Sequence, residues 1–150
     1  MVTPLVICVG NIARGDDGVA HAVAQELRDL AERDSAHVIV AVDLDVAMAH
    51  DVSRTPLVVL VDAERRDEPP VRVERVTAAG TTRPTGHGID APSLLAIAGA
   101  LYGSTPVMWL VSVAAPDMGH ATHLSHTARA ASIEAARAVG DLIELWRSKR

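Results

Sequence analysis

The stretch that decides the fold is Leu5-Val6-Ile7-Cys8-Val9, which runs directly into Gly10-Asn11-Ile12-Ala13-Arg14-Gly15-Asp16-Asp17-Gly18. An unbroken aliphatic run of this length is typical of a strand buried on both faces of a parallel sheet. The glycines and Asn11 predict a turn, and apolar residues at helical spacing from Val19 onward predict a helix after it. In such a strand–turn–helix unit the turn lies at the carboxyl edge of the sheet, where α/β proteins bind ligands.

The turn has the glycine spacing of a phosphate-binding loop but the opposite charge. Gly10 and Gly15 match the pattern G-x-x-x-x-G, whereas Asp16 and Asp17 stand where that pattern continues with Lys and Ser or Thr. Carboxylates at a helix N-terminus interact favourably with the helix dipole, by about 0.3–1 kcal/mol each, but they repel a bound anion. The turn therefore suits a cation better, and a nucleotide- or phosphate-binding module stays open as an alternative function.

The remaining chain alternates strand-like and helix-like segments. Short apolar runs predict further strands, and apolar residues at spacings of three and four predict helices between and after them. The predicted strands are His37 to Val42, Leu57 to Val61 and Val107 to Val113, and the predicted helices are Val19 to Leu30, Ala91 to Leu101 and about Thr127 to Trp146.

One further strand has a different pattern. In Val71 to Val76, valines alternate with charged residues, as in a half-exposed edge strand, and its connection to the strand Leu57 to Val61 is too short for a helical crossover. We therefore expect it to pair antiparallel with that strand. The whole pattern predicts an α/β fold: a three-layer, doubly wound mixed sheet of about five strands, mostly parallel with one antiparallel strand, and helices on both faces.

Composition narrows the class of protein. The 150 residues predict a single domain, 1–150, and a net charge of −5 gives no electrostatic basis for nucleic-acid binding. The lone Cys8 excludes an internal disulfide, so we expect an inert core thiol in a reduced, cytoplasmic protein. No apolar run approaches the roughly 20 residues that span a bilayer, so no membrane partner is expected.

The turn also resembles the signature of hydrogenase maturation proteases, the endopeptidases that trim the C-terminus of nickel-iron hydrogenase large-subunit precursors. The family pattern is roughly G-x-G-N, four residues, then D-[DE]-x-x-G or D-D-G-x-G. The chain has Cys8-Val9-Gly10-Asn11 and then Asp16-Asp17-Gly18-Val19-Ala20, so Cys8 and Ala20 replace the first and last glycines. Two more stretches follow in the family's order: the strand Leu57 to Val61 leads into Asp62, and Thr85-Gly86-His87-Gly88 precedes the helix from Ala91.

The resemblance implies a site and a substrate. The family's metal-recognising residues fall on Asp17, Asp62 and His87, which are therefore the expected catalytic and metal-contacting residues. The resemblance also implies that the nickel arrives with the precursor, so that the free enzyme holds no metal of its own apart from a possible adventitious divalent ion. The expected partner is the hydrogenase large-subunit precursor, bound by a monomer. Two carboxylates and an imidazole form a ligand set that suits Ni²⁺, Zn²⁺ or Fe²⁺.

One loop departs from the family pattern. Asp43-Leu44-Asp45-Val46-Ala47-Met48 stands in place of a D-G-G-T-x-G-like loop and keeps only the leading acid. This difference leaves a third function open, a catalytically silent relative that holds a hydrogenase assembly intermediate.

Other residues near these motifs have simpler interpretations. We expect Asp16 to cap the helix that follows it and Asn11 to form the turn. His120, His123 and His126 recur every third residue, but this stretch is better explained as a loop and a helix start capped by Ser125 or Thr127 than as a metal site.

Overall fold

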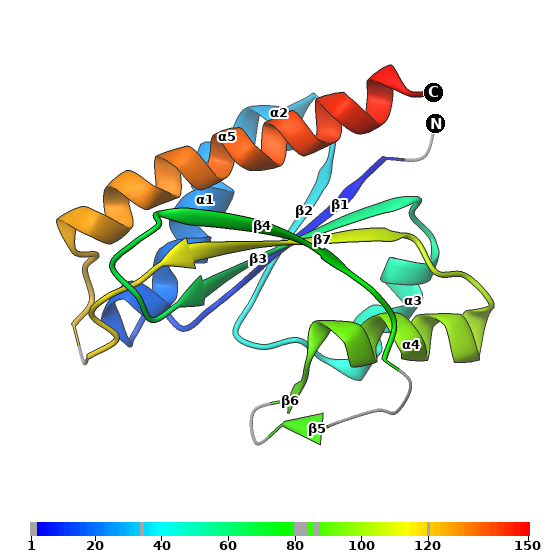
Figure 1. Cartoon of the computed structure of the whole chain (residues 1–150), viewed down its shortest axis with the longest axis horizontal. Coiled ribbons are helices and arrows are strands. Elements are labelled where there is room, and N and C mark those ends of the chain that lie inside the picture. Colours follow the sequence, from blue (N-terminus) through cyan, green and yellow to red (C-terminus); the bar gives the residue numbers. More distant parts are fainter. Residues whose placement is uncertain (1–2, 34, 80–83, 86–87, 120) are drawn as a thin grey trace.

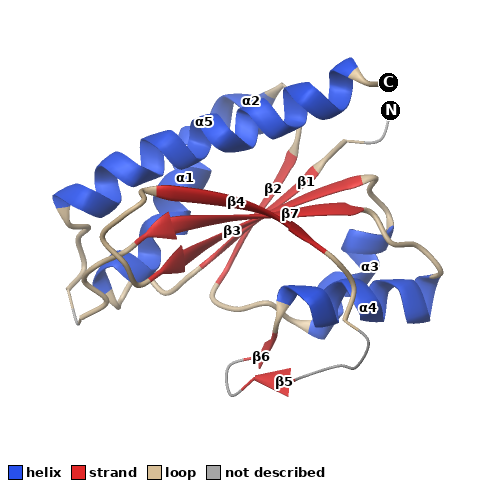
Figure 2. Ribbon diagram, viewed as in Figure 1, coloured by secondary structure: helices blue, strands red, loops and turns tan. Residues whose placement is uncertain are grey.

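The computed structural model describes residues 3–33, 35–79, 84–85, 88–119 and 121–150. The helices and strands form three layers, with a twisted sheet in the middle (Figures 1 and 2). The strands are β1 (Leu5–Val9), β2 (His37–Ala41), β3 (Leu57–Glu64), β4 (Val71–Val76), β5 (Pro84–Thr85), β6 (Gly88–Ile89) and β7 (Val107–Ala114). The α-helices are α1 (Val19–Glu26), α2 (Arg28–Glu32), α3 (Ala49–Ser53), α4 (Ala91–Tyr102) and α5 (His126–Ser148), and the 3₁₀ helices are η1 (Gly15–Gly18) and η2 (Val46–Met48).

The main sheet has the strand order β2-β1-β3-β7-β4, and β5 pairs with β6 in a separate two-stranded sheet. β1, β2, β3 and β7 are parallel, and β4 is antiparallel. The predicted fold class is therefore confirmed. Among the described residues, no helix is both long enough and apolar enough to cross a membrane.

The predicted partner of β4 was wrong. β4 pairs with β7, with Val71 opposite Val113 and Val76 opposite Met108, and not with β3. The reason is that β3 already has a parallel neighbour on each side, β1 and β7, so its backbone groups are used. The short β3–β4 connection therefore passes across the end of β7.

The core has two halves, one on each face of the sheet. Along β1, Val6 and Cys8 pack on the side of α1 and α5, whereas Leu5, Ile7 and Val9 pack on the side of α3 and α4. All five are buried, as the unbroken aliphatic run predicted. The predicted first helix is interrupted at Leu27, where α1 ends and α2 follows.

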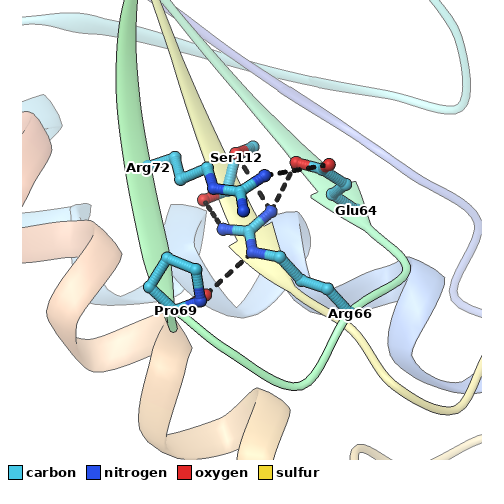
Figure 3. Close-up of polar contacts among 5 residues, drawn as sticks. All are labelled: Glu64, Arg66, Pro69, Arg72 and Ser112. Atoms are coloured by element: carbon cyan, nitrogen blue, oxygen red, sulfur yellow. Dashed lines mark hydrogen bonds and ion pairs between the residues drawn. The ribbon is translucent and has the colours of Figure 1, made fainter.

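Arg66 fixes the β3–β4 connection (Figure 3). Its Nε donates to the carbonyl oxygen of Pro69 at 2.8 Å, its Nη2 to that of Ser112 at 3.0 Å, and its Nη1 to the Ser112 hydroxyl at 3.1 Å. The guanidinium also forms an ion pair with Glu64, which in turn lies 3.5 Å from Arg72 of β4. Since only 9% of the Arg66 side chain is exposed, these bonds hold the connection against β7 with little competition from water.

The topology creates a switch point between β1 and β3. The chain leaves β1 to form β2 on one side and returns to form β3 on the other, so that Val9 pairs with Ala41 and also with Asp62. The carboxyl ends of these strands lie at one end of the sheet, and the start of β1 and the end of α5 lie at the other (Figure 1). Ligands of open α/β sheets bind in the crevice at such a switch point.

Candidate functional site

Asp17 is held in place by the turn between β1 and α1. Its Oδ2 accepts a hydrogen bond of 3.1 Å from the backbone N–H of Asn11, and the side chain of Asn11 accepts one of 2.9 Å from Ala13. Asn11 therefore forms the turn, as predicted. A Cβ on Gly10 would collide with the carbonyl oxygen of Asp17, so only glycine allows the two segments to approach this closely.

Asp16 does not cap its own helix, and the prediction for this residue was wrong. Neither η1 nor α1 has a side-chain cap, and Asp16 is 1% exposed. Its carboxylate accepts hydrogen bonds from the backbone N–H of Asp117 at 2.9 Å, the N–H of Ser125 at 2.7 Å and the hydroxyl of Ser125 at 2.7 Å. Asp16 thus ties the β1–α1 turn to the loop before α5, while the neighbouring Asp17 stays half-buried at the site.

Asp17 and Asp62 line one cavity at the switch point, together with Asp43. This cavity of about 300 Å³ is lined by Val9, Gly10, Asn11, Arg14, Asp17, Val42, Asp43, Asp62, Ala63 and Met118. A second cavity of about 370 Å³ shares Val9, Asp43 and Asp62 with it and extends over apolar side chains to Ile89, Pro92 and Leu110. The two cavities form one groove, acidic at its centre and largely apolar toward α4.

The acidic centre changes the protonation of Asp62. The pKa of Asp62 is raised to about 6, first by burial and then by the negative charges of Asp17, Asp43 and Glu64, against a hydrogen bond from the Ala63 backbone that lowers it. Asp62 is also exposed to solvent, which screens part of this effect. A carboxyl group with a pKa near 6 can take up and release a proton at neutral pH, which is what a general acid or base requires.

His87, the third expected site residue, lies outside the described residues. Its neighbour Gly88 is described, and a Cβ on Gly88 would come within 2.5 Å of the carbonyl oxygen of Leu44. The backbone of β6 therefore approaches the 43–48 loop, which is the loop that departs from the family pattern. Among the residues that the structure describes, no group of three or more His, Cys, Asp or Glu side chains is placed to hold a metal ion.

Two residues near the site were missed by the sequence analysis. Asp43 lines both cavities; in the sequence it is the acid just after a strand, at the start of the loop that otherwise departs from the family pattern. His21 lies in the first turn of α1 and makes a hydrogen bond of 2.8 Å between its Nε2 and the carbonyl oxygen of Gly10, so it supports the β1–α1 turn. No local pattern distinguishes such a histidine from one on a solvated helix face.

The histidine-rich stretch is a loop and a helix start, as predicted. Ser125 is the N-cap of α5, and its hydroxyl accepts a hydrogen bond of 3.2 Å from Ala128. His123 and His126 are exposed, and His120 lies outside the described residues.

Comparisons with known proteins agree on the fold. The hydrogenase-maturating endopeptidase HybD from E. coli superposes with a TM-score of 0.71 at 18% identity, over 92% of this chain and 90% of that one. The [NiFe] hydrogenase maturation protease HycI from Thermococcus kodakarensis gives 0.70 at 17% identity, over 95% and 93%. The hydrogenase 2 maturation peptidase of a Thaumarchaeota archaeon gives 0.65 at 22% identity, over 95% and 99%. No protein-family model and no curated protein sequence matches the chain.

The chain therefore has the fold of solved structures that are named as hydrogenase maturation proteases. The likeness extends over nearly the whole of each chain, so it is a likeness of the complete fold.

Proposed function

We propose that this chain is a hydrogenase maturation endopeptidase, which removes the C-terminal peptide of a nickel-iron hydrogenase large-subunit precursor after nickel insertion. The observation that carries the proposal is that Asp17 and Asp62, far apart in sequence, line one cavity at the switch point of a fold that this chain shares with such proteases. The resemblance of the β1–α1 turn to the family signature supports the same function independently.

The proposed mechanism assigns a role to each carboxylate. Asp17 and Asp62 contact the nickel that the precursor carries, which tells the enzyme that its substrate is loaded. A water or a carbonyl group polarised by that nickel takes part in cleavage of the peptide bond. His87 completes the contact or relays a proton, an assignment that rests on the resemblance alone. Nickel is thus part of the substrate, and the free protein acts as a monomer in the cytoplasm.

The test is processing of precursors. The protein is incubated with nickel-loaded and nickel-free large-subunit precursors, and the C-terminal mass of each product is measured. We expect cleavage of the loaded form alone. Absence of cleavage with retained binding would instead support the silent assembly factor, and a melting temperature raised by nucleotide would support the phosphate-binding module.

Replacing the site carboxylates tests the assignment of residues. Asp17→Asn and Asp62→Asn each remove a charge at the groove with little change of shape, and we expect processing to fall by about 10²-fold or more. Asp51→Asn is the matched control, because Asp51 is an exposed acid on α3 that lines neither cavity. Normal processing by either site variant would remove that residue from the mechanism.

A further inference from the structure

The two edge strands of the main sheet differ in composition. β4 carries Arg72, Glu74 and Arg75 among its valines. β2 continues into Val42 and reads His37-Val38-Ile39-Val40-Ala41-Val42, without Lys, Arg, Asp, Glu or Pro. Proteins commonly protect exposed edges with charges or proline, because unpaired backbone groups there pair with other chains. The edge of β2 has no such protection.

The hydrogen bonds of β2 establish which of its backbone groups face outward. His37 donates its N–H to the carbonyl oxygen of Pro4 at 2.8 Å, and the carbonyl oxygen of Ala41 accepts from Gly10 at 3.0 Å. These two residues therefore face β1. Since successive residues of a strand point their backbone groups to opposite sides, the N–H and C=O groups of Val38 and Val40 face away from the sheet. Within the described part of the chain, these outward groups have no hydrogen-bond partner.

The free edge leads into the candidate site. Val40 is 46% exposed and Val42 is 61% exposed, although both are large apolar side chains. Val42 lines the cavity that also contains Asp17, Asp43 and Asp62. Residues 37–42 span about 20 Å at the rise of a β-strand, which is enough to pair with five or six residues of an extended peptide.

We propose that the C-terminal segment of the precursor binds as an added strand along the outer edge of β2, antiparallel to it. The inference rests on the proposed function and assigns a binding surface to it. The peptide bond to be cut lies at the carboxylates, and the segment beyond it runs from Val42 back toward His37. Main-chain hydrogen bonds to Val38 and Val40 supply the affinity, as in other cases of strand addition, and apolar side chains at alternate positions of the segment pack on Val40 and Val42.

The test exploits the two edges of the sheet. Proline lacks the N–H group, so Val40→Pro removes an outward donor of β2 without removing a bond to β1. Val73→Pro is the matched control on β4. The bond from the Ala114 N–H to the Pro70 carbonyl oxygen shows that residues 70, 72 and 74 face β7, so the N–H of Val73 also points outward, and its exposed fraction is 42%.

We expect Val40→Pro to lower the processing of nickel-loaded precursor about tenfold or more, mainly through a higher KM, because a pairing hydrogen bond and its neighbours are lost. Val73→Pro should process at the wild-type rate. Equal processing by the wild-type protein and both variants would overturn the inference and leave the proposed function intact. A wild-type protein that cuts no precursor would overturn the proposed function, and the inference would fall with it.

Hydrogen exchange on the wild-type protein gives a second test that needs no variant. Short labelling pulses during turnover of nickel-loaded precursor should show slower exchange in segment 37–42 than in the free protein, with segment 71–76 unchanged. Unchanged exchange in both segments would overturn the inference. So would protection of segment 37–42 that appears without precursor and rises with protein concentration, because a second copy of the chain would then occupy the edge.

Discussion

At the scale of the residue, Asp62 links the chemistry of the site to the stability of the fold. Its pKa is about 6 in the folded protein and 3.8 in its ordinary state. The folded protein therefore holds more protons than the unfolded chain between these two values, so this residue lowers stability as the pH rises from about 4 to about 6. Above about pH 6 the loss of folding stability caused by ionised Asp62 reaches its full size.

We expect Asp62→Asn to be more stable than the wild-type protein at pH 7, because the amide carries no charge among the neighbouring carboxylates. Solvent in the cavity screens part of the effect, so the expected gain is about 1 kcal/mol, less than the pKa shift alone would give. Urea denaturation at pH 7 and below pH 4 measures it. The difference should disappear at the lower pH, and a gain that is equal at both values would contradict the explanation.

We expect Asp16 to contribute more to folding stability than an aspartate exposed on the surface. In Asp16→Asn, the side-chain amide would place N–H groups opposite the three donors of Asp117 and Ser125. Because charge-assisted hydrogen bonds are lost, we expect the free energy of unfolding to fall by about 2–4 kcal/mol. The exposed Asp141 of α5 supplies the control, since Asp141→Asn should change stability by less than about 0.5 kcal/mol. Denaturant unfolding of both variants measures the difference, and equal values would contradict the role assigned to Asp16.

The adjacent acids show how far sequence reasoning reaches at a site. A motif marks Asp17 and a strand end marks Asp62, and the structure brings these two residues to one cavity. The role of Asp16 could not be predicted, because its partners lie about a hundred positions away in the loop before α5. Asp43 was missed as a cavity residue for a similar reason, because only the folded sheet brings the loop after β2 to the same edge as the ends of β1 and β3.

At the scale of the element, the β3–β4 connection depends on one side chain. Arg66→Met keeps much of the apolar stem but leaves the carbonyl oxygen and hydroxyl of Ser112 without their donor. We expect a loss of about 2–3 kcal/mol and faster amide exchange in β4. Arg65→Met tests specificity, because Arg65 is exposed and should tolerate the change. Exchange in β4 that is the same in both variants would argue against this role.

The elements themselves were largely predictable, and their exceptions have physical causes. Alternation of valine with charge identified β4 as an edge strand, but sequence does not show which strand has a free side. That choice depends on β7, which follows in the chain and occupies the position beside β3. The break at Leu27 was equally invisible, because Leu27 keeps the helical spacing and remains buried.

At the scale of the whole molecule, Cys8 can report on global unfolding. It is fully buried in β1, an inner strand of the sheet, and burial raises the pKa of its thiol to about 12. A thiol reagent should therefore label Cys8 only when the sheet opens. We expect labelling rates to follow the population of unfolded protein as urea is raised, measured by intact mass. Rapid labelling without denaturant would show that β1 opens locally.

The layered architecture was the most predictable property of the molecule. Aliphatic strands buried on both faces require a cover on both faces, and the helical segments between them provide it. The groove could not be predicted from the sequence, because its lining depends on which strands end next to one another in the folded sheet.

The start of β1 and the end of α5 lie together at the end of the sheet away from the groove (Figure 1). An affinity handle, a fluorophore or a surface linker attached at either place would therefore point away from the carboxylates. The protein can be anchored to a sensor chip in one defined orientation, with the acidic groove open to a large approaching protein.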